Sequence, residues 1–148
     1  MSLMQRIDGA GGTTLDPEGL ERLRRELVVP SSLATLMTTA PLLGLRFSLS
    51  EKADKSGLGV EMQWMDAEQM RSEATEAYPG IVATKLGYFP IGTCLEGTGD
   101  PYFYRQSDGA VVRIPHDAAT ESGLNEGRVE TVAESVEQFV ALAALETP

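Results

Sequence analysis

Residues 88–117 read YFPIGTCLEGTGDPYFYRQSDGAVVRIPHD, and this stretch decides the fold. Two runs within it are typical of β-strands, the aromatic residues 102–104 and the β-branched residues 110–114. Asp108-Gly109 between them is a strong hairpin signal, because such a turn needs positive φ at low cost. A glycine-rich acidic turn at residues 96–100 joins this pair to the apolar run that opens the stretch. The stretch therefore predicts three consecutive antiparallel strands.

Three further strands, one of them a short edge strand, and four helices are predicted around this centre. Residues 45–49 and 60–64 alternate between apolar and polar side chains, which indicates two half-buried strands, and residues 129–133 predict a short edge strand. Each helix begins at a capping signal followed by an apolar stripe. These signals are Asp16-Pro17, Ser31 or Ser32, Asp66 with Gln69, and Ser135 with Gln138.

The strands cluster along the chain instead of alternating strictly with helices, which favours an α+β fold. We expect a mostly antiparallel sheet of four to six strands covered by about four helices. The glycine-rich residues 1–14 predict a flexible N-terminal lead-in, and residues 15–148 a single domain with one core. The polar residues 118–127, with two glycines, predict a mobile loop.

The net charge of −10 lies wholly in residues 51–148, because the first 50 residues hold five basic and five acidic side chains. Such a field repels nucleic acid and favours a basic partner or a cation. A surface that only keeps the protein soluble is the alternative. No stretch approaches a membrane span, and residues 1–10 lack the apolar core of a signal peptide, so we expect a cytoplasmic protein that does not enter membranes.

Signals of enzyme chemistry are sparse. Cys94 is the one cysteine and His116 the one histidine. A thiol dyad would need the two side by side, which nothing in the sequence indicates, and the neighbours of Cys94 favour a buried apolar role. His116 with Asp117 resembles half of an acid–base pair, but adjacent strand residues point to opposite faces. We therefore predict no catalytic residue.

Two binding motifs are also weak. Gly97-x-Gly99 has the form of a phosphate cradle, but Glu96 and Asp100 on either side repel phosphate. Four acids in or beside this stretch are candidates for Ca²⁺ binding, although their spacing matches no EF-hand loop. These acids are Glu96, Asp100, Asp108 and Asp117. The sequence thus predicts neither a cofactor nor a metal site.

Several motifs resemble those of the SUKH superfamily, which includes the yeast cell-wall glucan-synthesis regulator of the Smi/Knr type and many bacterial immunity proteins. They are YFPIG at residues 88–92, GTGDPY at 97–102, Asp108-Gly109, Val111-Val112, SVEQFV at 135–140 and VVPSSL at 28–33. The resemblance covers residues 15–145. The family usually has Asn-Gly after its second helix, where this chain has APLLG at residues 40–44.

The resemblance implies an α+β fold without a catalytic centre. In bacteria it implies an immunity protein that neutralises a cognate toxin, such as a nuclease, and in fungi a regulatory scaffold. The same two roles are our leading hypothesis and its alternative. A small hydrolase or transferase that uses His116 is the third candidate.

We expect acidic residues in the turn and the following loop to form an acidic rim that docks a basic protein partner, such as a toxin domain. Loops on a rigid sheet are common binding surfaces, and complementary charge steers association. The rim consists of Glu96, Asp100, Asp117, Glu121 and Glu126. No apolar pattern demands a stable oligomer, so a monomer or a weak homodimer is expected.

Overall fold

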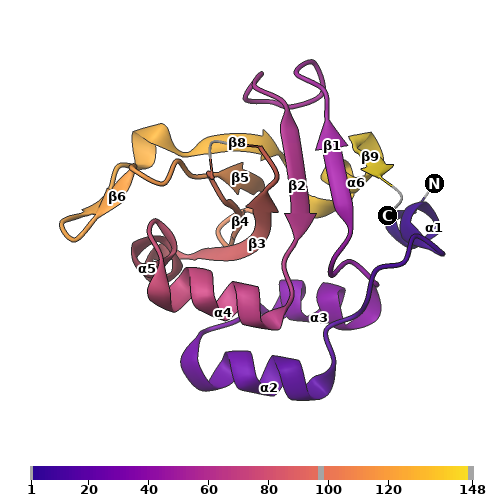
Figure 1. The fold of residues 1–148 in the computed structure, drawn as a ribbon, viewed down its shortest axis with the longest axis horizontal. Helices are drawn as coiled ribbons and strands as arrows, with labels where there is room; N and C mark the ends of the chain where they lie inside the picture. The colour runs from indigo at the N-terminus through magenta and orange to yellow at the C-terminus, as the bar shows by residue number, and fades with distance from the viewer. Residues whose placement is uncertain (1, 97–98, 147–148) are drawn as a thin grey trace.

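The computed structural model of the protein describes residues 2–96 and 99–146 and shows an α+β fold (Figure 1). Its centre is a seven-stranded antiparallel sheet in the order β8-β5-β4-β3-β2-β1-β9. The sheet curls, since the loop between β1 and β2 reaches the far edge strand, where Lys55 N–H donates to the Val132 carbonyl over 3.0 Å. Figure 1 shows α2, α3 and α4 together on one side of this sheet.

The predicted meander is confirmed, and its three strands lie side by side in the sheet. They are β3 (Tyr88–Cys94), β4 (Tyr102–Arg105) and β5 (Val111–Arg113). The other predicted strands are β1 (Arg46–Leu49), β2 (Val60–Trp64) and the edge strand β8 (Glu130–Ala133). The seventh strand, β9 (Ala144–Glu146), pairs with β1 and exceeds the four to six strands expected.

The described residues hold six α-helices, more than the four expected. They are α1 (Leu3–Ile7), α2 (Pro17–Glu26), α3 (Ser31–Thr39), α4 (Ala67–Glu76), α5 (Gly80–Ala83) and α6 (Val136–Leu142). Asp16 and Ser135 act as N-caps as predicted, and Asp66 with Gln69 forms the predicted capping box. The N-cap of α3 is instead Pro30, without a side-chain hydrogen bond, so the predicted caps Ser31 and Ser32 both lie inside the first turn. The Ser32 hydroxyl is bound to that of Tyr104 at 2.8 Å.

Part of the segment expected to be a flexible lead-in packs against the domain as α1. Ile7 is fully buried in the main core, and α1 contacts α6. The Arg6 guanidinium donates to the carbonyls of Val140 and Ala143 at the C-terminal end of α6. Those carbonyls lack partners within the helix, so a cation placed there satisfies them and complements the helix dipole.

Residues 118–127, expected to be a mobile loop, contain regular structure. Two short strands, β6 (Ala119–Thr120) and β7 (Gly123–Leu124), form a hairpin that projects from the body in Figure 1. A 3₁₀ helix, η2 (Glu126–Arg128), follows it, and another, η1 (Thr84–Leu86), follows α5. The hairpin forms because Ala118 and Leu124 pack against an apolar cluster, which polarity averaged over the segment does not reveal.

The sheet carries a core on each side of its central strands. Tyr102 and Tyr104 of β4 point into the main core, whereas Phe103 belongs to a second cluster that includes residues of α5 and β5. This split follows from the period of two along a strand. Beyond the end of β5 the chain leaves the sheet, and Ile114 and Ala118 belong to the second cluster.

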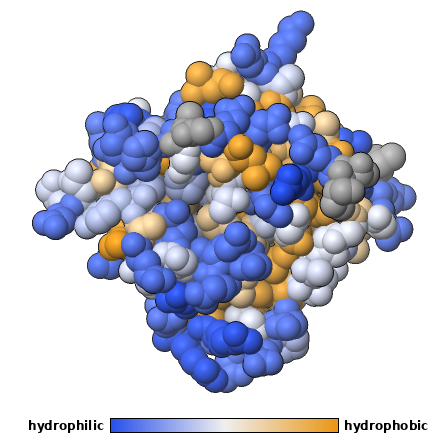
Figure 2. All heavy atoms as spheres, in the orientation of Figure 1, coloured by the Kyte–Doolittle hydropathy of each residue, from blue (hydrophilic) through white to orange (hydrophobic). Residues whose placement is uncertain are grey.

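The surface is predominantly hydrophilic on the face shown in Figure 2, with hydrophobic residues visible between the polar ones. Within the described part of the chain, no helix is long and apolar enough to cross a membrane.

Candidate functional site: an acidic hollow beside a buried arginine

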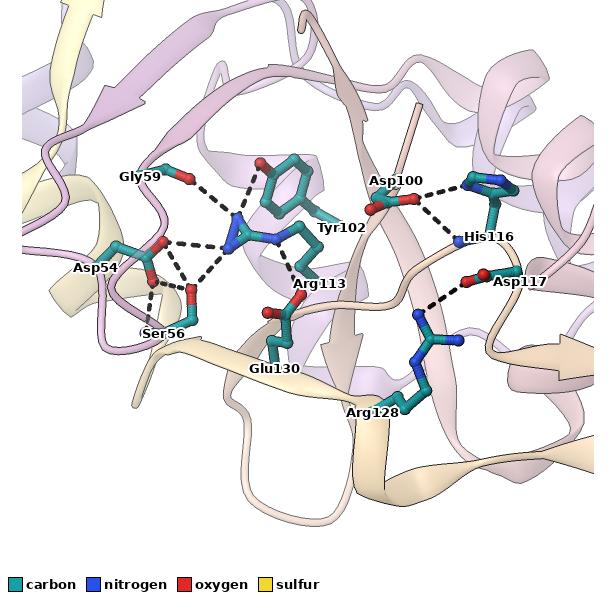
Figure 3. A network of polar contacts seen from close by, with 10 residues as sticks. All are labelled: Asp54, Ser56, Gly59, Asp100, Tyr102, Arg113, His116, Asp117, Arg128 and Glu130. Atoms are coloured by element: carbon teal, nitrogen blue, oxygen red, sulfur yellow. Dashed lines mark hydrogen bonds and ion pairs between the residues drawn. The ribbon is translucent and has the colours of Figure 1, made fainter. Parts of the chain in front are cut away.

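Arg113 is the last residue of β5 and is almost completely buried. Its side chain points toward the loop between β1 and β2 (Figure 3). Nη2 donates to the Ser56 hydroxyl at 2.6 Å and to Asp54 Oδ2 at 3.3 Å, while Nη1 donates to the Gly59 carbonyl at 3.0 Å. Nε donates to Glu130 Oε1 on the neighbouring strand β8 at 3.3 Å. Three segments of the fold, namely β5, the β1–β2 loop and β8, therefore meet at one guanidinium.

The electrostatics of this cluster keep Arg113 charged. Burial disfavours the guanidinium charge, but the hydrogen bond to Tyr102 and the charges of Asp54 and Glu130 outweigh it and raise the pKa of Arg113. Burial also raises the pKa of Tyr102 to about 12, so its hydroxyl stays protonated. The guanidinium carbon lies 5.5 Å from the Tyr102 ring centroid, a cation–π distance.

The chain turns away from the sheet after Arg113, and the turn presents His116 and Asp117. The backbone N–H of His116 donates to Asp100 Oδ1 over 3.0 Å, and its ring Nδ1 lies 2.8 Å from the same oxygen. A carboxylate oxygen accepts hydrogen bonds, so this contact places the ring proton on Nδ1. The ring is 63% exposed, so Nε2 faces away from Asp100 on an accessible side chain.

Asp117 makes a different contact from its neighbour. Its Oδ1 lies 2.9 Å from Nη2 of Arg128, the last residue of η2. The hydrogen bond from Arg128 lowers the pKa of Asp117. Both partners are exposed, with 46% of the Arg128 side chain and 64% of the Asp117 side chain accessible to solvent.

These contacts surround an open hollow of about 620 Å³ at the end of β5 and the start of β8. It is lined by Asp100, Pro115, His116, Asp117, Arg128 and Glu130. The carboxylates of Asp100 and Asp117 thus share the hollow with the Arg128 guanidinium. Figure 3 shows Glu130 between the two groups, with its carboxylate on Arg113 and its backbone beside the hollow.

Two residues of the predicted acidic rim, Asp100 and Asp117, line the hollow. Glu126 begins η2 next to it and accepts a hydrogen bond from the Tyr88 hydroxyl at 3.3 Å. Glu121 is exposed in the turn between β6 and β7. Glu96 follows the end of β3 and is not a lining residue. Its charge acts on Glu61 of β2, whose pKa is raised by burial, by Glu146 and by Glu96.

The other candidates from the sequence are placed apart. Gly97 of the phosphate-cradle motif lies outside the described residues. Asp108, a proposed calcium ligand, is bound by Arg105 in the β4–β5 turn, and the hydrogen bond from Arg105 lowers its pKa. Within the described ranges, no three acids, histidines or cysteines gather as a metal site would require. Cys94 is half-buried, and its thiol donates to the Glu96 carbonyl at 3.6 Å.

Sequence reasoning did not find Arg113, Asp54, Glu130 or the contact between His116 and Asp100. One signal for Arg113 was available, since it is a charged residue between Val112 and Ile114 in an otherwise apolar strand. A buried charge in such a run requires partners. The sequence does not say which loop supplies them.

Comparison of the chain with protein-family models gives no match, and comparison with curated proteins gives none either.

Proposed function

We propose that this chain is a non-enzymatic protein-binding module of the SUKH type that docks a basic protein partner. The role we favour is that of a bacterial immunity protein that neutralises a cognate toxin, such as a nuclease. The observation that carries the proposal is the concentration of acidic residues in the hollow and in the short elements that follow it along the chain, with one arginine among them. The carboxylates belong to Asp100, Asp117, Glu121, Glu126 and Glu130, and the arginine is Arg128.

The setting of these carboxylates supports docking. Asp117, Glu121 and Glu126 are exposed on turns and short elements that leave a seven-stranded sheet, so a rigid frame positions them. Asp100 and Glu130 are half-buried, and Glu130 belongs to β8 of the sheet itself. A nuclease domain has a basic cleft, which such a surface would attract over long range. A regulatory scaffold of the same fold would use the same surface for a different basic protein.

The test is capture from an extract of the native host, followed by elution in a salt gradient and mass spectrometry. The rim variant carries Asp117→Lys, Glu121→Lys and Glu126→Lys. Its control carries Glu18→Lys, Glu51→Lys and Glu137→Lys, three exposed acids elsewhere that change the net charge equally. We expect a basic protein that elutes at moderate salt, is lost with the rim variant and is retained by the control.

The identity of the captured protein separates the two roles. A toxin domain supports the immunity role, and a cell-envelope regulator supports the scaffold role. Retention of the same protein by the rim variant would contradict the docking surface.

A hydrolase or transferase that uses His116 is the second candidate, favoured by one observation. Asp100 holds Nδ1 of His116, an arrangement that orients an imidazole for acid–base catalysis through Nε2. Its test is a substrate screen. Turnover that is lost in His116→Ala would establish this role, and turnover that survives the substitution would exclude His116.

A further inference from the structure

We propose that the loop between β1 and β2 is a strap that guards the edge strand β8, and that a second copy of the chain can pair with β8 only when this strap opens. The β1–β2 strap consists of residues 50–59, between Leu49 and Val60. The inference concerns the assembly of the chain and does not depend on the proposed function.

The strand β8 lies at a position where another chain could join the sheet. It stands at one end of the strand order, beyond β5. An edge strand presents N–H and carbonyl groups that its own sheet does not use, and these groups can pair with another chain. The register between β5 and β8 passes over Val132, because Val112 pairs with Thr131 and Val111 with Ala133. The backbone at Val132 is therefore available to a different segment.

The β1–β2 strap takes this position, although β2 lies four strands from β8 in the order. Lys55 N–H donates to the Val132 carbonyl at 3.0 Å, a backbone contact of the kind that a further strand would make. The Lys55 ammonium lies 2.6 Å from Oε1 of Glu134, the residue after β8. One strap residue thus binds both the backbone of the edge strand and a charge at its end.

Three strap residues are anchored on Arg113 of β5, the strand next to β8. They are Asp54, Ser56 and Gly59, and the Asp54 side chain is fully buried. Because apolar residues of similar volume often stabilise a fold as well as a buried ion pair does, stability alone does not account for these anchors. Their geometric effect is to hold the strap in one position beside β8.

The strap also has a fixed shape of its own. Asp54 Oδ1 accepts hydrogen bonds from the backbone N–H and the hydroxyl of Ser56, both at 2.8 Å. Gly57 and Gly59 have φ of 79° and 83°, in the left-handed region that glycine adopts without a steric penalty. The strap is thus a preformed turn and not a slack connection, so we expect it to open and close as a unit.

The sequence of β8 suits a second copy of the same strand. It reads ETVA at residues 130–133, with two β-branched residues at its centre, which favour strands. In an antiparallel pair about a twofold axis at the centre of β8, Glu130 lies opposite Ala133, so the charges of the two copies do not oppose each other directly. The other edge strand, β9, is three residues long and carries Glu146, and shortness and charge both protect an edge.

The experiment replaces the strap by Asn-Gly, a two-residue turn that joins Leu49 to Val60, which pair in the register. This strapless variant also carries Arg113→Met, because the buried guanidinium would otherwise lack Asp54. Circular dichroism shows whether the variant folds, and sedimentation velocity over a wide range of concentration gives its oligomeric state. We expect a monomeric wild type and a strapless variant whose dimer fraction rises with concentration. A folded strapless variant that stays monomeric, or a wild type that dimerises equally, would overturn the proposal.

Lys55→Pro is the milder variant. It keeps the three anchors on Arg113 and removes the N–H and the ammonium that contact β8. We expect the same shift toward dimer to a smaller extent. This variant decides the question if the strapless chain does not fold, and a Lys55→Pro protein that stays monomeric would then overturn the proposal.

A further substitution in the strapless variant tests whether the dimer forms through β8. Thr131→Lys should restore the monomer, because lysine on an edge strand opposes pairing. Thr120→Lys, at an exposed threonine of β6, makes the same change in net charge and should leave the dimer intact. A dimer that survives Thr131→Lys, or that both substitutions abolish equally, would overturn the role of β8.

Discussion

Arg113 and Arg128 both pair with aspartate (Figure 3), but the first pair is buried and the second is exposed. The side chains of Arg113 and Asp54 are 6% and 0% exposed, whereas those of Arg128 and Asp117 are 46% and 64% exposed. Water solvates the second pair and screens it, but it does not reach the first. The arginine–aspartate pair is therefore a buried structural contact in one place and a solvated surface contact in the other.

The comparison teaches where binding function can lie. Every donor of the Arg113 guanidinium points to a protein acceptor, and removal of Arg113 would leave the Asp54 carboxylate buried without its cation. The Arg113 cluster therefore stabilises the fold and has no donor left for a partner. The Arg128 pair costs little to open, so its groups are available to a partner.

The largest effect is expected from Arg113→Met. The substitution leaves the Asp54 carboxylate buried without its cation, which destabilises a protein by about 3–5 kcal/mol. Urea denaturation at pH 7 measures the change. Arg128→Met is the matched control and should leave the unfolding midpoint within error of the wild type. Equal losses in both variants would contradict the distinction drawn between the two pairs.

Glu73 on α4 is an intermediate case, a half-buried carboxyl that accepts a hydrogen bond from a backbone N–H, that of Gly80, at 3.0 Å. Burial raises the pKa of Glu73 to about 7, and the hydrogen bond from Gly80 only partly offsets this. The unfolded chain has an ordinary glutamate pKa, so between about pH 4.5 and 7 the folded state holds a proton that the unfolded state has lost.

Stability should consequently fall as pH rises through this window, and Glu73→Gln, which cannot ionise, should remove the loss. With allowance for solvent screening, we expect the variant to be about 2 kcal/mol more stable than the wild type at pH 8. At pH 4.5 the two should be similar. Denaturation curves at both pH values measure the difference, and a gain of the same size at both would show that ionisation is not its cause.

Ser56→Ala should have a smaller effect within the buried cluster. The Ser56 hydroxyl accepts from Arg113 at 2.6 Å and donates to Asp54, so its loss leaves both charges paired but less completely hydrogen-bonded. We expect a loss of about 1 kcal/mol in urea denaturation. A loss as large as that of Arg113→Met would mean that the serine, and not the ion pair, holds the loop to the sheet.

Asp117→Asn should have the smallest effect on stability. The contact with Arg128 lowers the pKa of Asp117, so its contribution is present above the ordinary aspartate pKa and is lost as pH falls through the lowered value. Because the side chain is exposed, acid-unfolding curves of the variant and the wild type should superimpose. Separation of the curves below pH 4 would indicate a structural role for this pair.

The sequence predicted the elements whose signals are local. Asp108-Gly109 and the strands on either side identified the β4–β5 hairpin, and Asp66 with Gln69 identified the start of α4. The strand β9 was not predicted, because residues 144–146 form a strand only by pairing with β1, nearly one hundred residues earlier. The helix α1 was not predicted, because Gly9 and Gly11 suggest flexibility and the burial of Ile7 depends on contact with α6.

The candidate site was predicted only in part, because local signals identify single residues and not their distant partners. Asp100 and Asp117 were chosen for their place in turns, and both line the hollow. Their partners were not predicted, because Asp100 binds a histidine sixteen residues away and Asp117 binds an arginine from η2. Glu96 satisfied the same criteria of charge and turn position, yet it acts on Glu61 of the neighbouring strand. The geometry of the sheet therefore places Glu96 away from Asp100 and Asp117, although all three are acidic residues in turns.

The central claim is that the exposed acidic end docks a basic partner, and the most direct measurement is the association rate of the captured partner at low and high salt. For the wild type we predict a rate that falls steeply as salt rises. The rim variant Asp117→Lys, Glu121→Lys, Glu126→Lys should associate slowly at all salt concentrations, and the control Glu18→Lys, Glu51→Lys, Glu137→Lys should follow the wild type. Equal slowing of both variants, or a rate that is independent of salt, would contradict the account.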